Sequence, residues 1–380
     1  MKIIVRTYSG VEQILKDEIE RLTGKEVTIE RRAVSFDGNT EDLYKVNLWS
    51  RLAIDVLVHL YSFRVRDEDD LYNKLTNFKW EEHLSENETF SFSSIVHSSN
   101  FRHSQYVALK AKDALVDRFK KRTGKRPNVE RKNPDHHFIV RISEKEGSIL
   151  WNSSGNPLFK RGYRTHTVEA PVNEVLAAAI LDLSDWNDQT PLIDPMCGSG
   201  TFLCEALIKS SNYAPGLNRK QFAFEKTKDF KNELWNTLVE QAKGSTKESS
   251  AKIYGFDNDE DAIFFTSNNL ENLFPTNKVT LEKNDFFSLE KPIEDGMLLM
   301  NPPYDVRLKN TNIDDFYNDI GRRLKHFWEN YDAWIFSGNL SATKRLGLKP
   351  NKKIILFNGP LECKLLHLPI YRGSKKQKVS

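Results

Sequence analysis

The sequence predicts an α/β protein in which a doubly wound parallel sheet follows two smaller α+β segments. Three observations support this fold class. After Arg164, short apolar strands that end at polar residues alternate with helical stretches, which is the pattern of a parallel sheet. The glycine turn Cys197–Gly200 joins one of these strands to an apolar helix. Before Arg164, strands and helices form shorter units, the first with a ferredoxin-like pattern.

Length and composition exclude several classes of protein. The 380 residues suffice for two or three domains, each with its own core. With 29 % charged and 11 % aromatic residues, the chain is not disordered, collagen-like or coiled-coil. No stretch approaches the roughly 18 apolar residues of a membrane span. Cys197, Cys204 and Cys363 form no CxxC pair and no disulfide framework. We expect a cytoplasmic protein without a metal site, and Met1–Arg6 as a strand, not a signal peptide.

The net charge of +3 is unevenly distributed along the chain. Residues 1–164 contain 29 Lys and Arg against 24 Asp and Glu, a net charge of +5. The remaining residues contain 27 against 29, a net charge of −2. A basic excess in the N-terminal part weakly favours a polyanionic partner.

Residues 1–65 are predicted to form the first, ferredoxin-like domain. Apolar residues alternate with polar ones in its strands and recur at helical spacing in its helices. The predicted strands cover residues 2–7, 27–30, 33–36 and 51–63, and the helices cover 11–23 and 40–48.

Residues 66–158 are predicted to form a second α+β domain. Helices are expected over 67–78 and 104–119, and strands over 89–96, 138–143 and 147–152. A basic turn follows the second helix. Its charges are candidate phosphate contacts, although a charge run is often only a solvated face. His136 and His137 are expected in a surface loop. The basic residues of the turn are Lys120, Lys121, Arg122, Lys125 and Arg126.

The segment Asp194–Thr201 resembles the first nucleotide-binding turn of a doubly wound sheet. It follows the strand 191–194 and precedes an apolar helix. Gly198 and Gly200 let the backbone approach a ligand, although two glycines fit an ordinary strand-to-helix turn equally well. The segment contains neither GxGxxG nor Gly-Lys-Ser/Thr, which disfavours NAD and ATP and leaves an adenosyl ligand open.

Asp257 ends the next predicted strand, 253–257, and Asp285 directly follows the one after it, 279–284. Asp257, followed by Asn258, can accept hydrogen bonds from both ribose hydroxyls, whereas a lone Asp at this position is more often a helix N-cap. Asp285 can accept from an adenine amino group while Phe286 packs near the ring. The alternative for Asp285 is a turn at the strand end.

The tetrapeptide Asn301-Pro302-Pro303-Tyr304 follows the apolar strand 297–300. Two consecutive prolines fix φ near roughly −65° and remove two amide donors, so the loop is rigid and not helical. Such a loop can direct the Asn301 amide oxygen and the Pro302 carbonyl at one exocyclic amino group. The Tyr304 ring can stack on a flat base.

This order of motifs resembles the class I S-adenosylmethionine-dependent methyltransferases that act on planar amino nitrogens. When residues 159–164 and 170–174 are included, the sequence is similar to the large-subunit (23S) ribosomal RNA guanine-N2 methyltransferases. The resemblance covers nearly the whole chain. It implies a ferredoxin-like domain (1–65), a THUMP RNA-binding domain (66–158) and a Rossmann-like methyltransferase domain with a mostly parallel seven-stranded sheet (159–380). Val172 and the residues 305–308 depart from the family pattern.

The resemblance also implies roles for these residues. Asp194 and the Cys197–Gly200 backbone would hold the methionine part of S-adenosylmethionine, Asp257 its ribose and Asp285 its adenine. Asn301 and Pro302 would accept from guanine N2. Asp305 is a weak candidate for a general base. The full cofactor set is Asp194, Pro195, Cys197, Gly198, Ser199, Gly200, Thr201, Asp257, Asn258, Asp285 and Phe286, and the catalytic set is Asn301, Pro302, Pro303 and Tyr304.

Four other functions remain open at this point. The substrate could be guanine N2 of tRNA, because THUMP-bearing relatives also modify tRNA. DNA adenine-N6 methyltransferases and the enzymes that methylate release-factor glutamine share the tetrapeptide, but they differ in their accessory domains. A non-catalytic RNA-binding assembly factor would be expected to have lost some of the motif residues.

Overall fold

The computed structural model describes residues 1–101, 103–166, 171–276, 278–304 and 312–371. The chain folds into two compact units, and the parts of each unit are not contiguous in sequence. The first unit comprises Met1–Thr7, Lys16–Leu158 and Arg219–Glu240, and the second comprises Tyr8–Leu15, Phe159–Asn218 and Gln241–Ser380.

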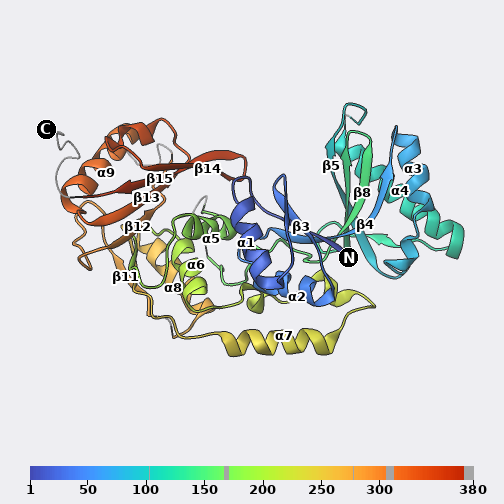
Figure 1. Cartoon of the computed structure of the whole chain (residues 1–380), viewed down its shortest axis with the longest axis horizontal. Helices are drawn as coiled ribbons and strands as arrows, with labels where there is room; N and C mark the ends of the chain where they lie inside the picture. Colours follow the sequence, from blue (N-terminus) through green and yellow to red (C-terminus); the bar gives the residue numbers. More distant parts are fainter. Residues whose placement is uncertain (102, 167–170, 277, 305–311, 372–380) are drawn as a thin grey trace. The chain divides into compact units, whose positions relative to one another are not determined.

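One eight-stranded sheet, in the order β2-β3-β1-β4-β8-β7-β5-β6, organises the first unit (Figure 1). Strand β4 pairs antiparallel with β8, so the predicted ferredoxin-like and THUMP segments share one continuous sheet. The strands are β1 (Lys2–Arg6), β2 (Thr28–Glu30), β3 (Ala33–Asp37), β4 (Asp55–Arg64), β5 (Thr89–His97), β6 (Asn128–Val129), β7 (His136–Ser143) and β8 (Glu146–Asn152).

Helix α4 extends further than the sequence predicts. It runs over Ser104–Thr123, and Gly124 ends it with φ +75°. The first three residues of the predicted basic turn therefore lie in the last helical turn, where cations interact favourably with the helix dipole. The other helices of this unit are α1 (Glu12–Thr23), α2 (Thr40–Trp49), α3 (Glu68–Asn77) and η1 (Trp80–Glu82).

The expectation that His136 and His137 lie in a surface loop is wrong. Both residues begin strand β7, and the side chain of His136 is buried. Burial lowers the pKa of His136, because it disfavours the charged imidazolium. The histidine pair is therefore part of the sheet.

Residues Arg219–Glu240 pack within the first unit although they follow the glycine turn in sequence. They include η3 (Ala223–Lys226) and most of α7 (Asn232–Ser245). The rings of Tyr44 and Phe224 stack with centroids 4.4 Å apart, and Lys226 Nζ lies 3.0 Å from Asp135 Oδ1. The ranges 1–65, 66–158 and 159–380 remain our proposed division into domains.

The second unit contains a seven-stranded sheet in the order β11-β10-β9-β12-β13-β15-β14. Its first five strands are parallel, and β15 runs antiparallel to β13 and β14. This confirms the predicted mostly parallel class I methyltransferase sheet. The strands are β9 (Leu192–Asp194), β10 (Ile253–Asp257), β11 (Thr280–Lys283), β12 (Gly296–Met300), β13 (Tyr331–Ser337), β14 (Lys352–Asn358) and β15 (Leu361–Pro369).

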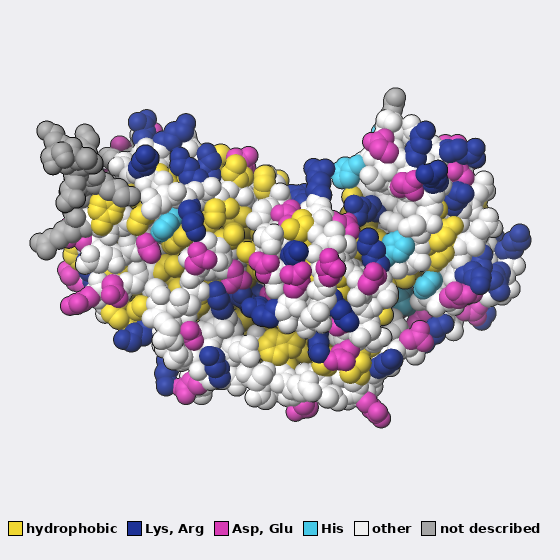
Figure 2. Space-filling view, in the orientation of Figure 1, with side chains coloured by type: hydrophobic (Ala, Val, Ile, Leu, Met, Phe, Trp, Pro, Cys, Tyr) yellow, Lys and Arg dark blue, Asp and Glu magenta, His cyan; other side chains and the backbone are white. Residues whose placement is uncertain are grey.

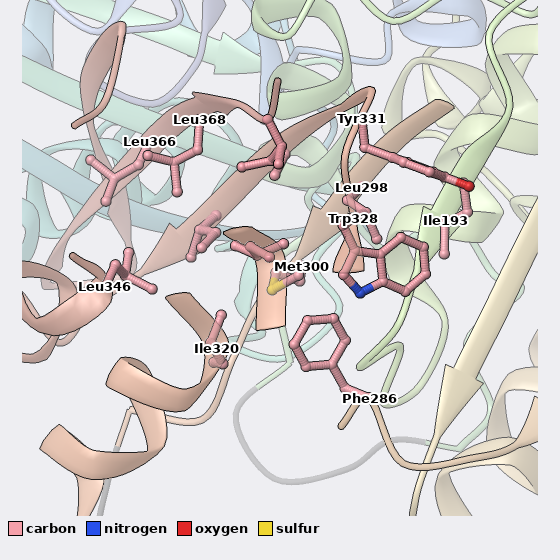
Figure 3. Packing of buried hydrophobic residues seen from close by; sticks show 14 of the residues in the cluster. Ile193, Phe286, Leu298, Met300, Ile320, Trp328, Tyr331, Leu346, Leu366 and Leu368 are labelled. Carbon is pink, nitrogen blue, oxygen red and sulfur yellow. The ribbon is translucent and has the colours of Figure 1, made fainter. Parts of the chain in front are cut away.

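Helices cover both faces of this sheet. A buried cluster joins one face to α9 and η4, and Phe286 and Trp328 lie within it (Figure 3). Phe256 belongs to this cluster, whereas a Cβ on its neighbour Gly255 would meet Leu203 of α6 on the other face. In the described part of the chain, no helix is long and apolar enough to cross a membrane. The helices are α5 (Glu174–Leu183), α6 (Thr201–Ser210), η2 (Pro215–Asn218), α8 (Glu260–Leu273), α9 (Ile313–Phe327) and η4 (Ala342–Leu346).

A buried ion pair attaches the segment 159–164 to helix α6. Arg161 Nε donates to Glu205 Oε1 at 2.9 Å, and the Tyr163 hydroxyl donates to the same oxygen at 3.1 Å. Both charged side chains are buried. Because α6 begins directly after the glycine turn, this network anchors the helix that follows the turn.

We expect Glu205→Gln to lower the free energy of unfolding by about 3–5 kcal/mol, because the buried Arg161 guanidinium loses its counter-charge. Urea unfolding of the full chain measures this loss. The control Asp319→Asn breaks the exposed pair of Asp319 with Arg322 and should change stability by less than about 1 kcal/mol. Similar losses in the two variants would contradict a structural role for the buried pair.

Candidate active site

Four polar residues meet at the carboxyl edge of the parallel strands. Strands β11, β10, β9 and β12 are neighbours in the sheet, and they lead to Asp285, Asp257, Asp194 and Asn301, respectively. Because the strands are parallel, their carboxyl ends share one edge, which is where ligands bind in open α/β sheets. The structure therefore brings together four residues that lie far apart in sequence.

The glycine turn is hydrogen-bonded to the end of β10. The backbone N–H of Gly198 donates to Asp257 Oδ2 at 2.8 Å, and that of Cys197 donates to the Phe256 carbonyl at 2.9 Å. The second carboxylate oxygen of Asp257 accepts from the Asp259 backbone at 3.0 Å. These bonds place the turn beside the Asp257 carboxylate.

Two buried side chains of α8 hold the turn from behind, and the sequence analysis missed both. Thr266 Oγ1 donates to the Gly198 carbonyl at 2.8 Å, and Asn269 Nδ2 donates to the Ser199 carbonyl at 3.0 Å. A Cβ on Gly200, which has φ +75°, would lie 2.6 Å from Thr266 Cγ2, so only glycine fits there. The sequence feature that could have revealed them is a pair of polar residues, three apart, on the otherwise apolar buried face of α8.

Asp194 and Asp257 have no basic partner in the part of the chain that the structure describes. Asp194 is 1 % exposed, and burial raises its pKa well above the usual value for a carboxyl. Burial and the charge of Asp259 also raise the pKa of Asp257. Among the described residues, no Lys, Arg or His forms an ion pair with Asp194 or Asp257. The hydroxyl of Ser199 is buried and has no hydrogen-bond partner there.

The remaining residues of the predicted cofactor turn have different surroundings. Pro195 is buried, and Asn258 is exposed. Burial raises the pKa of the Cys197 thiol well above its usual value, which keeps it neutral. Thr201 Oγ1 accepts a hydrogen bond from Arg164 Nη2 at 2.8 Å, so this hydroxyl already has a partner.

Asp285 and Phe286 follow β11, but the ring of Phe286 does not face the site. Asp285 Oδ1 accepts from the backbone N–H of Phe287 at 2.9 Å, as in a turn at a strand end, and the residue is exposed. Phe286 is 2 % exposed and lies parallel to Trp328 in the core (Figure 3). The expectation that its ring packs beside an adenine is wrong, because burying this large apolar ring in the core is strongly favoured.

The loop Asn301–Tyr304 follows β12 at the same edge. Pro302 is buried, and the Tyr304 hydroxyl donates a hydrogen bond to Asn301 Oδ1. An amide oxygen accepts two hydrogen bonds, so this contact leaves one acceptor site on Asn301. Burial raises the pKa of Tyr304, and the hydroxyl therefore remains protonated at neutral pH.

Residues of α9 and of the turn after β13 hold this loop in place, and the sequence analysis did not single them out. Asn339 Nδ2 donates to the Tyr304 carbonyl at 2.9 Å. The Tyr317 hydroxyl lies 3.4 Å from the Pro303 carbonyl. A Cβ on Gly338 would clash with Leu361 Cδ2 and lie 3.1 Å from Tyr304 Cδ2, so glycine leaves room for both side chains. The sequence of this turn carries no catalytic signature.

The predicted RNA contacts of α4 divide into two groups. Arg122 pairs with Glu81, and Lys125 Nζ lies 2.7 Å from Glu86 Oε1. In the described part of the chain, Lys120, Lys121 and Arg126 form no ion pair. Asp305, Ala170 and residues 306–308 lie outside the described residues.

Comparison with known families identifies this architecture. The family described as "RMKL-like, methyltransferase domain" matches residues 161–367. The chain belongs to this family of methyltransferases. The families of the THUMP domain and the RlmL ferredoxin-like domain match residues 65–150 and 2–57. The resemblance inferred from the sequence is thereby confirmed.

The chain is similar to relatives of two lengths. A candidate RNA methyltransferase of Synechocystis sp., slr0064, is 34 % identical over 364 residues, which are 95 % of each protein. Ribosomal RNA large subunit methyltransferase K/L of Syntrophotalea carbinolica is 34 % identical over 382 residues, which are 97 % of this chain and 54 % of that protein. The chain thus spans about half the length of this K/L relative.

A solved structure supports the fold of this methyltransferase. The crystal structure of SMU.472, a methyltransferase candidate complexed with SAH, has a TM-score of 0.84 at 27 % identity. The similarity covers 98 % of this chain and 99 % of that one.

We expect Asp194→Asn to stabilise the ligand-free methyltransferase at pH 7. Burial raises the folded-state pKa of Asp194 above its unfolded value of about 4. Between these values the folded state binds more protons, so the free energy of unfolding falls as pH rises through this interval. Asparagine does not titrate, so it removes this loss of stability, which is about 1.4 kcal/mol for each pH unit between the two pKa values. Urea unfolding from pH 4 to pH 8 measures the difference.

The control for this experiment is Asp229→Asn, which removes an exposed carboxylate and should leave the pH profile unchanged. An Asp194→Asn variant that is no more stable than the original chain at pH 7 would contradict the raised pKa.

We expect Asn339→Asp to lower the rate of methyl transfer about 10- to 100-fold, because the Tyr304 carbonyl loses its donor and the loop shifts. The aspartate keeps the side-chain oxygen that accepts from the Ala342 backbone. Single-turnover kinetics measure the rate, and calorimetry should find cofactor affinity unchanged. The same substitution at Asn187, an exposed turn residue, is the control. Loss of cofactor binding together with rate would contradict a positioning role.

Proposed function

We propose that this chain transfers a methyl group from S-adenosylmethionine to the exocyclic N2 of a guanine in 23S ribosomal RNA. The observation that carries the proposal is the Asn301–Tyr304 loop, which lies beside the glycine turn at the carboxyl edge of the sheet. The names of the K/L relatives support ribosomal RNA as the substrate. A substrate of this kind would place the protein in the cytoplasm.

S-adenosylmethionine is the cofactor of the chain. It supplies a methyl group that is made reactive by a positively charged sulfonium. The residues fit such a ligand, because Asp194 and Asp257 are carboxylates without basic partners among the described residues and a cationic group would complement them. The buried Ser199 hydroxyl is a further polar group available to the ligand. Asp194 and the turn would hold the methionine part, Asp257 the ribose and Asp285 the adenine.

Asn301 and Pro302 orient and stabilise the attacking nitrogen. The lone pair of guanine N2 is delocalised into the ring, and two acceptors directed at its hydrogens would localise it. Positive charge grows on this nitrogen as it bonds to carbon, and fixed oxygen dipoles stabilise that charge. The Tyr304 hydroxyl fixes the Asn301 amide so that its second acceptor site faces the substrate. The Tyr304 ring, which is only partly buried, can stack on the base.

The first unit supplies the RNA contacts. The THUMP match covers α4, and the unpaired basic side chains at the end of that helix are phosphate contacts in this proposal. Arg122 and Lys125 are held by carboxylates and contribute less, since RNA would have to displace those partners. The residues that form no ion pair within the described ranges are Lys120 and Lys121 at the end of α4 and Arg126 just beyond it.

The proposal is tested by product analysis. The purified chain is incubated with labelled S-adenosylmethionine and with unmodified 23S rRNA or tRNA, and the labelled nucleoside is identified by mass spectrometry. N2-methylguanosine from 23S rRNA confirms the proposal. The same nucleoside from tRNA alone would move the substrate to tRNA, and a methylated adenosine or uridine would contradict the assignment to guanine N2.

Asn301→Ala should reduce the rate of methyl transfer about 10²- to 10³-fold, because it removes a fixed acceptor from the charged transition state. Single-turnover kinetics with saturating RNA measure the rate. Calorimetric titration with S-adenosylhomocysteine should give an affinity close to that of the original chain. Equal losses of rate and of cofactor affinity would contradict this role.

A further inference from the structure

Residues 341–370 form a basic segment in an otherwise acidic domain. They contain six Lys and Arg and a single Asp or Glu. The preceding residues 165–340 contain 17 Lys and Arg against 28 Asp and Glu. The small net charge after Arg164 therefore conceals a strong local excess, and Figure 2 shows Lys and Arg side chains gathered over η4 and β14.

Most of these cations form no ion pair with a carboxylate that the structure describes. Arg345 Nε lies 2.9 Å from Asp314 Oδ2, and Lys352 Nζ lies 3.4 Å from Asp185 Oδ2. In the described part of the chain, the other four basic side chains form no ion pair. These four are Lys344, Lys349, Lys353 and Lys364.

The strand register places two of these charges, Lys353 and Lys364, on one face of the β14–β15 hairpin. Lys353 pairs with Leu366, and Ile355 pairs with Lys364. Residues opposite each other or two apart on paired strands share a face, so Lys353, Ile355 and Lys364 lie together. Leu366 packs in the same cluster as the apolar residues of η4, which places exposed Lys344 on this side as well.

This face is continuous with the candidate active site. Met300, the last residue of β12, pairs with Ile335, and Lys364 pairs with Ser337. Ser337 lies two residues beyond Ile335, and Pro302 lies two residues beyond Met300. Lys364 is therefore level with Pro302, and the two backbones are separated by two strand spacings, a distance of roughly 10 Å. Lys364 therefore lies at the same level of the sheet as the catalytic loop.

We propose that the hairpin face, defined as Lys344, Lys353, Ile355 and Lys364, binds the phosphate backbone of the substrate RNA next to the target base. The proposal rests on the proposed RNA methylation and adds a contact surface within the methyltransferase unit itself. Unpaired ammonium groups complement phosphates, and Ile355, which is 52 % exposed, can contact a sugar or base. Phosphate contacts beside the loop would hold a flipped guanine in register.

The test uses the full chain and a triple variant, Lys344→Gln with Lys353→Gln and Lys364→Gln. Binding to an unmodified 23S rRNA transcript is measured between 50 and 200 mM KCl in the presence of S-adenosylhomocysteine. Loss of three phosphate contacts should reduce the slope of log affinity against log salt by roughly 2–3. Affinity at the higher salt concentration should fall at least about tenfold, while calorimetry should find S-adenosylhomocysteine binding unchanged.

Two further variants complete the test. The first is a control triple variant, Lys247→Gln with Lys252→Gln and Lys278→Gln, which makes the same change in net charge. These lysines precede β10 and β11, at the amino ends of the parallel strands, so this variant should bind RNA as the original chain does. Replacement of the three hairpin lysines by arginine keeps the charge and should preserve the slope.

The outcomes separate this surface from the proposed function. If the glutamine variant keeps the original affinity and slope while the original chain binds and methylates RNA, the hairpin face is wrong and the proposed function stands. If the original chain binds no RNA at any of these salt concentrations, both proposals fail.

Discussion

The adjacency of β10, β9 and β12 in the second sheet is the constraint on which the candidate site depends. These strands are parallel, so each needs a helical crossover, and their carboxyl ends are forced to one edge. Asp257, Asp194 and Asn301 therefore become neighbours although more than 100 residues separate the last two. The hydrogen bond from Gly198 to Asp257 is the local contact that joins two of these ends.

The polar groups of this edge are held in place by residues outside the motifs. Thr266 and Asn269 of α8 fix the carbonyls of the glycine turn, and Asn339 fixes the carbonyl of Tyr304. The carboxylate of Asp194, in contrast, is buried without a basic partner in the described chain, which costs stability. Rigid supports around an unfavourable charge are typical of a preorganised site, in which stability is given up for binding.

The strands of the parallel sheet, the glycine turn and the diproline loop could be predicted from the sequence, because each rests on local periodicity or on backbone restrictions of Gly and Pro. The burial of the Phe286 ring could not, since a residue after a strand end has no periodicity to show which way its side chain points. The extension of α4 to Thr123 could not be predicted either, because its charged last turn continues no apolar periodicity. The packing of Arg219–Glu240 in the first unit depends on distant partners such as Tyr44. The role of Asn339 depends likewise on a contact 35 residues away in sequence.

The most direct test of the account is the structure of the chain bound to S-adenosylhomocysteine and an RNA fragment that contains the methylated position. The account predicts a guanine whose N2 lies within hydrogen-bond distance of Asn301 Oδ1 and of the Pro302 carbonyl, with the Tyr304 hydroxyl still bonded to Asn301. A target base whose amino group lies away from Asn301, or a base other than guanine at this loop, would contradict it.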